Sequence, residues 1–384
     1  MKYKVLFILA IIFLPQIVLA AKLEVSGWIP YWRKEKGVAD ALAHIDYFTE
    51  INPFGYTVKS DGTLADTAKM GEEPWTTLIA EAKKRKIRVI PTVMWSDTEA
   101  IHRILSNQKK RIALEDEIAK LVKDNNFDGI DIDFEGKYAK TKDYYSTFLK
   151  GLYLRMGKKW VMCTIEARTP LSSRYDTIPT DGSIRYANDF VAINKYCDRV
   201  RIMTYDQGTI DVKLNRARMA PYIPVSDPAW VEKVINLTMQ TIPKKKLSIG
   251  IATYGYEYKV TKLSEYGYRY DMEWALNPQY GIDLAKSLGI TPTRNGSNEI
   301  GFMYKATTTM PTSAENGITT NVPTSTTAEN QSSQIINGSV NIVWWSDATA
   351  IKDKVDLAKK LGVRGVSIFK IDGGEDPNMW DVLK

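Results

Sequence analysis

The sequence predicts an α/β protein built as a closed (β/α)8 barrel, a TIM barrel, with a small α+β insertion between strands 7 and 8. Three observations lead to this fold. Short apolar runs rich in Val, Ile and Phe alternate with amphipathic stretches of helical period, which indicates a parallel sheet covered by helices. Eight such runs occur, and eight units close a barrel. No GxGxxG turn follows an early run, which disfavours an open, doubly wound sheet.

The expected strands are short runs in which β-branched and aromatic residues predominate. In chain order they are Val25–Trp32, Phe48–Tyr56, Val89–Trp95, Gly129–Phe134, Trp160–Ala167, Val200–Tyr205, Leu247–Tyr254 and Gly365–Ile371. Helices are expected between most of them, where apolar residues recur at spacings of three and four. They are Trp75–Lys86, Ile112–Asn125, Tyr144–Met156, Trp230–Thr241 and Ile351–Leu361. We expect residues 21–384 to form the barrel domain.

The interval between the seventh and eighth expected strands is much longer than the others. This excess predicts an inserted α+β subdomain over residues 257–343, with a helix at Gln279–Leu288. Within it, residues 307–341 are dominated by Ser, Thr, Asn and Gly, which is typical of a flexible surface loop. We expect that loop to be solvated rather than to contact a substrate.

Composition narrows the chemistry that the chain can perform. Its 384 residues are enough to bury a large core, yet only two of them are histidines, His44 and His102. A His triad or a two-His metal motif therefore lacks its raw material, and we expect neither metal nor organic cofactor. The net charge of +7 comes from interspersed charges, so nucleic acid is not an expected partner.

The first twenty residues have the pattern of a signal peptide. Lys2 and Lys4 precede an apolar core at residues 5–14, and Val18-Leu19-Ala20 forms a small-residue cleavage site. This predicts an exported protein, secreted or held in the periplasm or cell envelope, without stable membrane association. For the two cysteines, Cys163 and Cys197, a disulfide and a pair of buried thiols remain equal alternatives. The oligomeric state is not predicted.

The fourth expected strand carries a ladder of carboxylates. Acidic and apolar residues alternate strictly from Asp131 to Glu135, which places Asp131, Asp133 and Glu135 on one face of the strand. In a barrel this face points into the lumen, and Glu135 reaches the C-terminal rim where barrel active sites lie. Carboxylates spaced about 6–7 Å apart repel, and this repulsion raises a pKa as a general acid requires.

The segment Asp128-Gly-Ile-Asp131-Ile-Asp133-Phe-Glu135 resembles the DxxDxDxE signature of the family 18 glycoside hydrolases. The resemblance implies that Glu135 protonates the glycosidic oxygen. It also implies that Asp133 orients the substrate's 2-acetamido group, whose carbonyl oxygen attacks the anomeric carbon. Asp131 would share a proton with Asp133, and Asp128 would be structural.

The sixth expected strand ends in Met203-Thr-Tyr205-Asp206, which is similar to the family's Met-x-Tyr-Asp segment. The resemblance implies that the Tyr205 hydroxyl supports the acetamido group and that Asp206 and Met203 contact the sugar. A buried tyrosine with a satisfied hydroxyl is the structural alternative. Glu166 and Arg168, at the end of the fifth strand, either form a surface ion pair or contact substrate.

Aromatic residues at the expected rim are candidate sugar contacts, because flat apolar ring faces suit the apolar faces of sugars. They are Tyr31, Trp95, Tyr254 and Phe369. The family usually has Trp where this chain has Phe369, which still stacks but lacks an N–H donor.

The resemblance implies retaining, substrate-assisted hydrolysis of β-1,4 bonds in polysaccharide that contains N-acetylglucosamine, which is the expected partner. Residues 343–348 and 361–370 are similar to the bacterial cell-wall and spore-cortex branch. Chitin and peptidoglycan both remain open as substrates, as do the N-glycans of glycoproteins. A non-catalytic, lectin-like barrel is the alternative from another functional class.

Overall fold

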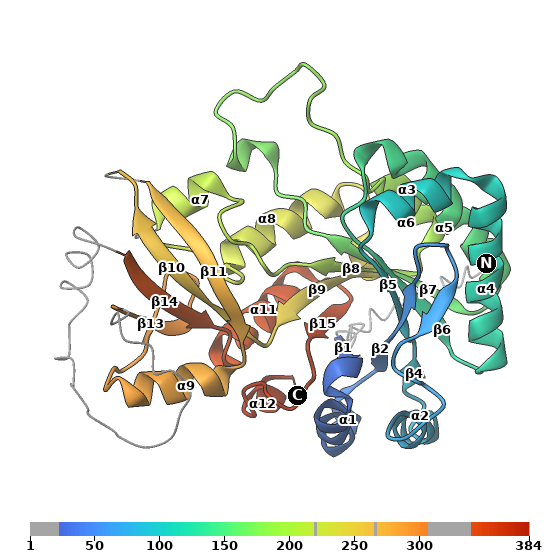
Figure 1. Cartoon of the computed structure of the whole chain (residues 1–384), viewed down its shortest axis with the longest axis horizontal. Coiled ribbons are helices and arrows are strands. Elements are labelled where there is room, and N and C mark those ends of the chain that lie inside the picture. The colour runs from blue at the N-terminus through green and yellow to red at the C-terminus, as the bar shows by residue number, and fades with distance from the viewer. Residues whose placement is uncertain (1–22, 219–220, 265–266, 306–338, 384) are drawn as a thin grey trace, which may run out of the picture.

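The computed structural model of the chain describes residues 23–218, 221–264, 267–305 and 339–383 (Figure 1). The predicted signal peptide lies outside the described residues. Eight positions of parallel strand run in the order β1-β15-β9-β8-β7-β6-β5-β2, and β1 pairs with β2 to close the barrel. The predicted (β/α)8 barrel is therefore confirmed.

The barrel strands fall close to the expected runs. Their bounds are β1 Glu24–Pro30, β2 Glu50–Val58, β4 Arg88–Val89, β5 Thr92–Trp95, β6 Gly129–Phe134, β7 Trp160–Glu166, β8 Arg199–Met203, β9 Leu247–Ala252 and β15 Gly365–Phe369. The short strand β4 and β5 share the third position, because both pair with β2. A further strand, β3 Leu64–Asp66, extends β2 as an antiparallel hairpin.

Helices surround the barrel, and apolar side chains from the strands fill the layer between. The helices are α1 Lys34–Ala43, α2 Trp75–Lys84, α3 Thr98–Ser106, α4 Gln108–Asp124, α5 Lys142–Met156, α6 Phe190–Tyr196, α7 Val212–Ala217, α8 Pro228–Met239, α11 Ala348–Leu361 and α12 Met379–Val382. The outward residues of β6, namely Ile130, Ile132 and Phe134, are fully buried in this layer. No described helix has the length and apolar character needed to cross a bilayer.

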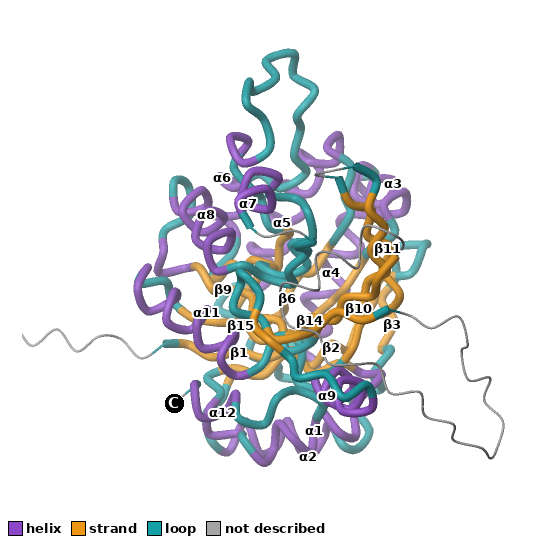
Figure 2. The backbone as a smooth tube through the Cα atoms, turned by 90° about the vertical axis from the view of Figure 1, so that its left-hand side faces the viewer, coloured by secondary structure: helices purple, strands orange, loops and turns teal. Residues whose placement is uncertain are grey.

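A disulfide joins Cys163 on β7 to Cys197, directly after α6. The structure thus decides between the two alternatives that the sequence left open for these cysteines. The bridge links the middle of β7 to the residue that follows α6, so it encloses both the loop 167–189 and α6. This loop projects from the top of the molecule in Figures 1 and 2.

A second sheet lies between barrel strands β9 and β15. Its five antiparallel strands run in the order β11-β10-β14-β13-β12, and α9 covers it beside the barrel (Figure 2). The bounds are β10 Gly255–Lys262, β11 Tyr268–Leu276, α9 Pro278–Ser287, β12 Thr293–Arg294, β13 Ile300–Tyr304 and β14 Ser339–Trp345.

The polar loop predicted at 307–341 differs from the structure at its end. Residues 339–341 open strand β14, where Asn341 pairs with Lys259 of β10. The alternating residues Val340, Ile342 and Trp344 bury one face of that strand, a pattern that the polar composition of the preceding stretch concealed. The rest of the predicted loop, residues 307–338, lies outside the described residues.

Candidate active site

Strand β6 presents its carboxylates to the barrel lumen as the period-two pattern predicts. Asp131 and Asp133 are buried, and Glu135 follows the strand at the rim, half-buried. The backbone N–H of Glu135 donates to the carbonyl of Trp95, at 2.8 Å, and this bond fixes the rim end of the ladder. Gly129 at the other end is required, because a Cβ there would lie 2.3 Å from the carbonyl oxygen of Trp160.

Asp131 is surrounded by donors. Its Oδ2 accepts hydrogen bonds from Trp28 Nε1 and Thr92 Oγ1, both at 2.9 Å, and its Oδ1 accepts one from Thr164 Oγ1 at 2.9 Å. Arg201 Nη1 lies 2.9 Å from the same Oδ1. Asp131 thus accepts three hydrogen bonds, while Arg201 Nη1 is an ionic neighbour that makes no hydrogen bond to it. The proton that the resemblance has Asp131 share with Asp133 stays a prediction.

Burial raises the pKa of Asp131 to about 6, and the three hydrogen bonds oppose this rise. Asp133 differs, since its Oδ1 is buried without a hydrogen-bond partner among the described residues. Burial raises the pKa of Asp133 well above its usual range, and the charges of Glu135 and Asp131 add to the effect. Asp133 thus keeps an oxygen available to a ligand.

The pKa of Glu135 is raised by burial and by the charge of Glu166, while Lys137 opposes the rise. Neighbouring carboxylates in a buried site disfavour double ionisation, so burial and repulsion both favour a proton on the pair Asp133 and Glu135. A proton held at Glu135, on the rim, is placed where a general acid is needed.

Two residues near Glu135 were given no role, or were not singled out, from the sequence. Lys137 is buried beneath the rim, with its ammonium 4.8 Å from the Tyr145 ring centroid and 3.5 Å from Glu166 Oε2. Glu166 accepts hydrogen bonds from the Gly136 backbone N–H at 3.0 Å and from Asn188 Nδ2 at 2.6 Å. Burial acts to raise the pKa of Glu166, but Lys137 and these bonds outweigh it and hold the pKa low. Glu166 is therefore a fixed negative charge beside Glu135.

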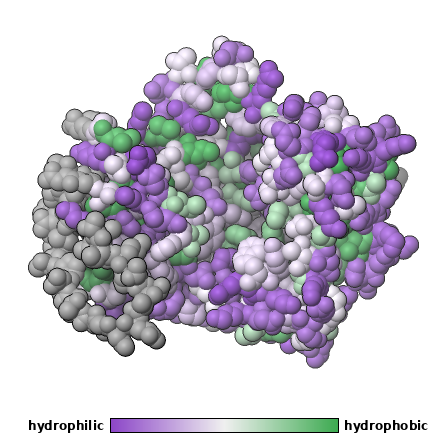
Figure 3. Space-filling model, viewed as in Figure 1, coloured by the Kyte–Doolittle hydropathy of each residue, from purple (hydrophilic) through white to green (hydrophobic). Residues whose placement is uncertain are grey.

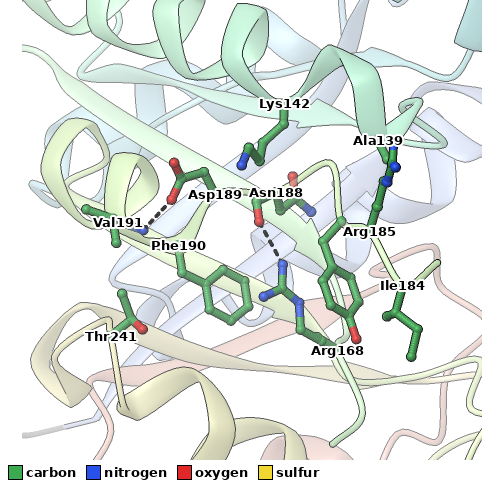
Figure 4. Close-up of a pocket in the computed structure, with 11 residues that line it drawn as sticks. Ala139, Lys142, Arg168, Ile184, Arg185, Asn188, Asp189, Phe190, Val191 and Thr241 are labelled. Carbon is green, nitrogen blue, oxygen red and sulfur yellow. Dashed lines mark hydrogen bonds between the residues drawn. The ribbon is translucent and has the colours of Figure 1, made fainter. Parts of the chain in front are cut away.

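Glu166 and Arg168 do not form the ion pair that was one of the two alternatives. Glu166 pairs with Lys137, whereas the Arg168 guanidinium lies between the rings of Tyr186 and Phe190, 3.8 and 4.1 Å from their centroids. Arg168 also donates to the Asn188 carbonyl at 2.7 Å (Figure 4). The sequence could not reveal this arrangement, because Tyr186 and Phe190 reach Arg168 only through the fold of the long loop.

Tyr205, at the end of β8, stacks on Phe369 with ring centroids 5.7 Å apart and an interplanar angle of 17°. Its ring is buried, yet its hydroxyl has no hydrogen bond to any described residue, which disfavours the structural alternative of a satisfied core tyrosine. Burial raises the pKa of Tyr205 well above its usual range, so the hydroxyl stays a donor. Met203 packs against the same cluster.

Asp206 is held by two tyrosines. Its Oδ1 accepts hydrogen bonds from the hydroxyls of Tyr254, at 2.7 Å, and Tyr256, at 2.6 Å. Burial raises the pKa of Asp206, while both bonds oppose the rise. Tyr256 was missed from the sequence because it lies two residues beyond the expected seventh strand, at the start of strand β10.

Trp95 is not at the rim surface, which corrects its prediction as a sugar contact. It is 2% exposed and packs edge-on against Phe134, with ring centroids 5.3 Å apart. Strand alternation explains this, since Thr92 binds the lumen residue Asp131 and Trp95, three residues later, faces the helices. Tyr31 lies after β1 in a half-buried position, with its ring edge-on to Trp32.

Two adjoining hollows lie at this rim. The first, of about 300 Å³, is lined by Asp206, Tyr254, Tyr256 and Phe369, together with Trp32 and Lys370. The second, of about 510 Å³, continues onto the inserted sheet and includes Trp274 and Tyr280. Figure 3 shows this face of the molecule hollowed between the inserted sheet and the barrel. The two hollows can hold an extended ligand that runs from Asp206 and Phe369 toward the inserted sheet.

Residues 27–374 match the sequence profile of glycosyl hydrolases family 18. The chain is 24% identical over 330 residues to the uncharacterized glycosylase YvbX of Bacillus subtilis, with 82% of this chain and 79% of that protein covered. It is 26% identical over 346 residues to a cortical fragment-lytic enzyme of the same organism, with 88% and 67% covered.

Solved structures share the fold. The spore cortex-lytic enzyme SleL of Bacillus megaterium superposes with a TM-score of 0.67 at 22% identity, with 94% of this chain and 73% of that chain covered. A chitinase from Chromobacterium violaceum superposes with a TM-score of 0.69 at 18% identity, with 94% and 98% covered.

Proposed function

The chain belongs to glycosyl hydrolases family 18 and is a glycoside hydrolase, and from this premise we propose that it cleaves β-1,4 bonds on the reducing side of N-acetylglucosamine residues. The configuration is retained, and the substrate's own acetamido group is the nucleophile. Two groups carry the proposal. One is the buried Oδ1 of Asp133, two residues before Glu135 on the same face, which has no hydrogen-bond partner among the described residues. The other is the hydroxyl of Tyr205, which has no hydrogen bond to a described residue. These groups match the N–H and the carbonyl oxygen of an acetamide.

In the first step, Glu135 gives its proton to the glycosidic oxygen as the bond to the anomeric carbon breaks. The acetamido carbonyl oxygen bonds to that carbon from the opposite face and forms an oxazolinium ion. Asp133 accepts a hydrogen bond from the acetamido N–H and stabilises the positive charge that develops on this group. Tyr205 donates to the carbonyl oxygen and so holds it in line with the anomeric carbon. Asp206 accepts a sugar hydroxyl.

In the second step, water attacks the anomeric carbon and loses a proton to the Glu135 carboxylate. The carbon–oxygen bond of the oxazolinium breaks, which restores the acetamide and the protonated Glu135. Two inversions at one carbon leave the β configuration unchanged.

Polymers of the peptidoglycan and chitin classes both present the required acetamido group. Relatives named as cortical fragment-lytic enzymes and a structural neighbour named as a chitinase support this substrate range. The signal-like residues 1–20 support action outside the cytoplasm, where such polymers occur.

The test is to incubate residues 21–384 with N-acetylglucosamine tetramers and with purified peptidoglycan, and to identify the products by mass and by the anomer first formed. Cleavage that yields the β anomer supports the proposal. Binding without cleavage of either substrate would instead support the lectin-like alternative, and initial release of the α anomer would overturn the mechanism.

Tyr205→Phe is expected to lower kcat by about 10²-fold with a smaller change in KM, because the acetamido carbonyl loses the donor that holds it in line with the anomeric carbon. The ring stacking on Phe369 is kept, so the variant isolates the hydroxyl. Initial rates on an N-acetylglucosamine oligomer measure the effect. Tyr256→Phe is the matched control for loss of a rim hydroxyl, and an equal loss of kcat in both variants would contradict a specific role for Tyr205.

Glu166→Gln is expected to move the alkaline limb of the kcat/KM profile to lower pH. Glu135 must be protonated to act as the acid, so activity falls as pH rises through its pKa. The charge of Glu166 raises the pKa of Glu135, and removing that charge lowers it. Rates from about pH 4 to pH 9 measure the limb. Glu72→Gln, at an exposed site, is the control, and a limb that stays in place or moves to higher pH refutes the assignment.

A further inference from the structure

A groove leads from the candidate active site onto the inserted sheet, and the mechanism above makes no use of its outer part. The two hollows at the rim share Trp32, Leu276, Asn277 and Lys370, so they form one continuous depression. The outer hollow has a volume of about 510 Å³. A polysaccharide that is cleaved beside Phe369 therefore has a path for the sugar next to the reacting one.

Three aromatic side chains are exposed along this outer groove. Trp32 is 51% exposed, Trp274 is 47% exposed and Tyr280 is 38% exposed. Trp274 and Tyr280 meet edge-on, with ring centroids 5.6 Å apart and an interplanar angle of 90°, so each holds the other in place. Large apolar faces left open to water and arranged along a groove are typical of a ligand site.

Two cations line the same groove around one buried carboxylate. Asp372 is 1% exposed and pairs with both Arg33, at 3.6 Å, and Lys370. It also accepts from the Gly374 backbone N–H at 3.1 Å. Among the residues that line the outer hollow, the two positive charges of Arg33 and Lys370 stand against the single negative charge of Asp372, an excess of +1. The Nε of Arg33 has no hydrogen-bond partner among the described residues.

Asn277 connects these charges to the inserted subdomain. It accepts a hydrogen bond from Lys370 Nζ at 2.9 Å and donates to Asp372 Oδ2 at 3.3 Å. Arg33 and Lys370 are therefore held in place by hydrogen bonds and ion pairs. Their partners come from the barrel, through Asp372, and from the insertion, through Asn277. A carboxylate that entered the groove would meet an excess positive charge and a guanidinium whose Nε has no hydrogen-bond partner among the described residues.

We propose that this outer groove binds the N-acetylmuramic acid residue of peptidoglycan through its carboxylate, with Arg33 as the main anion contact and Trp32 and Trp274 against the sugar. The inference rests on the proposed function and favours peptidoglycan over chitin as its substrate. In the alternating polymer, the N-acetylglucosamine whose bond is cleaved has a muramic acid residue as its neighbour on both sides. One of these directly follows the cut, and the other precedes the N-acetylglucosamine. Chitin supplies only neutral sugars, which would leave the excess positive charge without a partner.

The carboxylate can belong to the bare lactyl group or to the peptide attached to it. Calorimetry in the Glu135→Gln background avoids turnover and compares four ligands. They are an N-acetylglucosamine tetramer, the alternating tetrasaccharide with bare lactyl carboxylates, the same compound with these groups amidated, and the same compound carrying stem peptides. The expected preference for a carboxylate-bearing ligand over the amidated one is about tenfold or more.

Arg33→Gln is expected to abolish this preference, while Arg269→Gln keeps it, since Arg269 lies on the same sheet but does not line the groove. Trp274→Ala is expected to weaken all four ligands. The preference should also shrink as salt rises, because Arg33 is 38% exposed. If the form with bare lactyl carboxylates binds more tightly than the amidated form, the lactyl group supplies the carboxylate. If only the form with stem peptides binds more tightly, the peptide supplies it.

Equal affinity for the acidic and amidated ligands, or a preference that survives Arg33→Gln, overturns the inference. This failure is distinct from failure of the proposed function. A wild-type chain that cleaves the N-acetylglucosamine tetramer but shows no carboxylate preference keeps the function and loses the subsite. A chain that cleaves nothing but retains the preference loses the function and keeps the subsite.

Discussion

Glu135→Gln is expected to lower kcat by about 10²–10⁴-fold, the usual contribution of a positioned general acid. The amide has nearly the shape of the carboxyl group but cannot give a proton to the departing oxygen. Substrate binding should be retained, because the groove and Asp133 are unchanged. Initial rates on an N-acetylglucosamine oligomer give kcat, and calorimetry gives affinity.

The leaving group makes this prediction specific. An aryl glycoside with an acidic phenol needs little protonation, so the loss caused by Glu135→Gln should be much smaller on that substrate than on the oligomer. Misfolding would lower both rates equally. Glu72→Gln, at an exposed position, is the matched control. Equal losses on the two substrates, or an oligomer rate within about tenfold of wild type, would falsify the assignment of Glu135 as the acid.

The carboxylate ladder could be predicted from the sequence because it depends only on local geometry. A strict alternation over five residues fixes which side chains share a face, and the position of Glu135 at the strand end follows from the barrel. Trp95 could not be placed in the same way. The third strand is split into β4 and β5, and β5 reads Thr-Val-Met-Trp. Each of these residue types can face either the lumen or the helices. Which side chains of β5 face the lumen is therefore set by its pairing with β6.

The rest of the site depends on contacts between residues far apart in the sequence. Lys137 and Glu166 meet only because neighbouring strands end side by side, and no local pattern marks their pairing. Trp274 is one of three aromatic residues in strand β11 of the insertion, and the sequence of this strand does not indicate which of them lines a groove beside the barrel. Arg201 differs from these residues, because an arginine in an otherwise apolar strand predicts a buried acidic partner. The sequence does not identify which carboxylate that partner is.

Arg201 lies inside the barrel between two carboxylates. Its guanidinium contacts Glu50 of β2 and lies 2.9 Å from Asp131 Oδ1, and the three side chains are at most 3% exposed. Burial lowers the pKa of Arg201 to about 9, which still leaves it charged at neutral pH. Glu50 has a second partner, Arg88, at 3.0 Å, whereas Asp131 has no other ionic partner among the described residues.

Arg201→Met is therefore expected to lower the free energy of unfolding by about 3–5 kcal/mol, the typical cost of breaking a buried pair from one side. The loss should grow with pH. Without the cation, the pKa of Asp131, which burial already raises, rises further in the folded chain. The folded chain then binds more protons than the unfolded chain, so its stability falls as pH increases. Urea unfolding at about pH 5 and pH 8 measures both effects.

Two further variants keep the prediction testable if Arg201→Met does not fold. Arg201→Lys retains the charge and should recover part of the stability. Glu50→Gln added to Arg201→Met removes one stranded carboxylate and should recover stability mainly at the higher pH. Arg269→Met, at an exposed pair, is the control for loss of an arginine. If Arg201→Met lowers the free energy of unfolding no more than this control does, or if its effect does not change with pH, the Arg201 charge does not stabilise the buried carboxylates of Asp131 and Glu50.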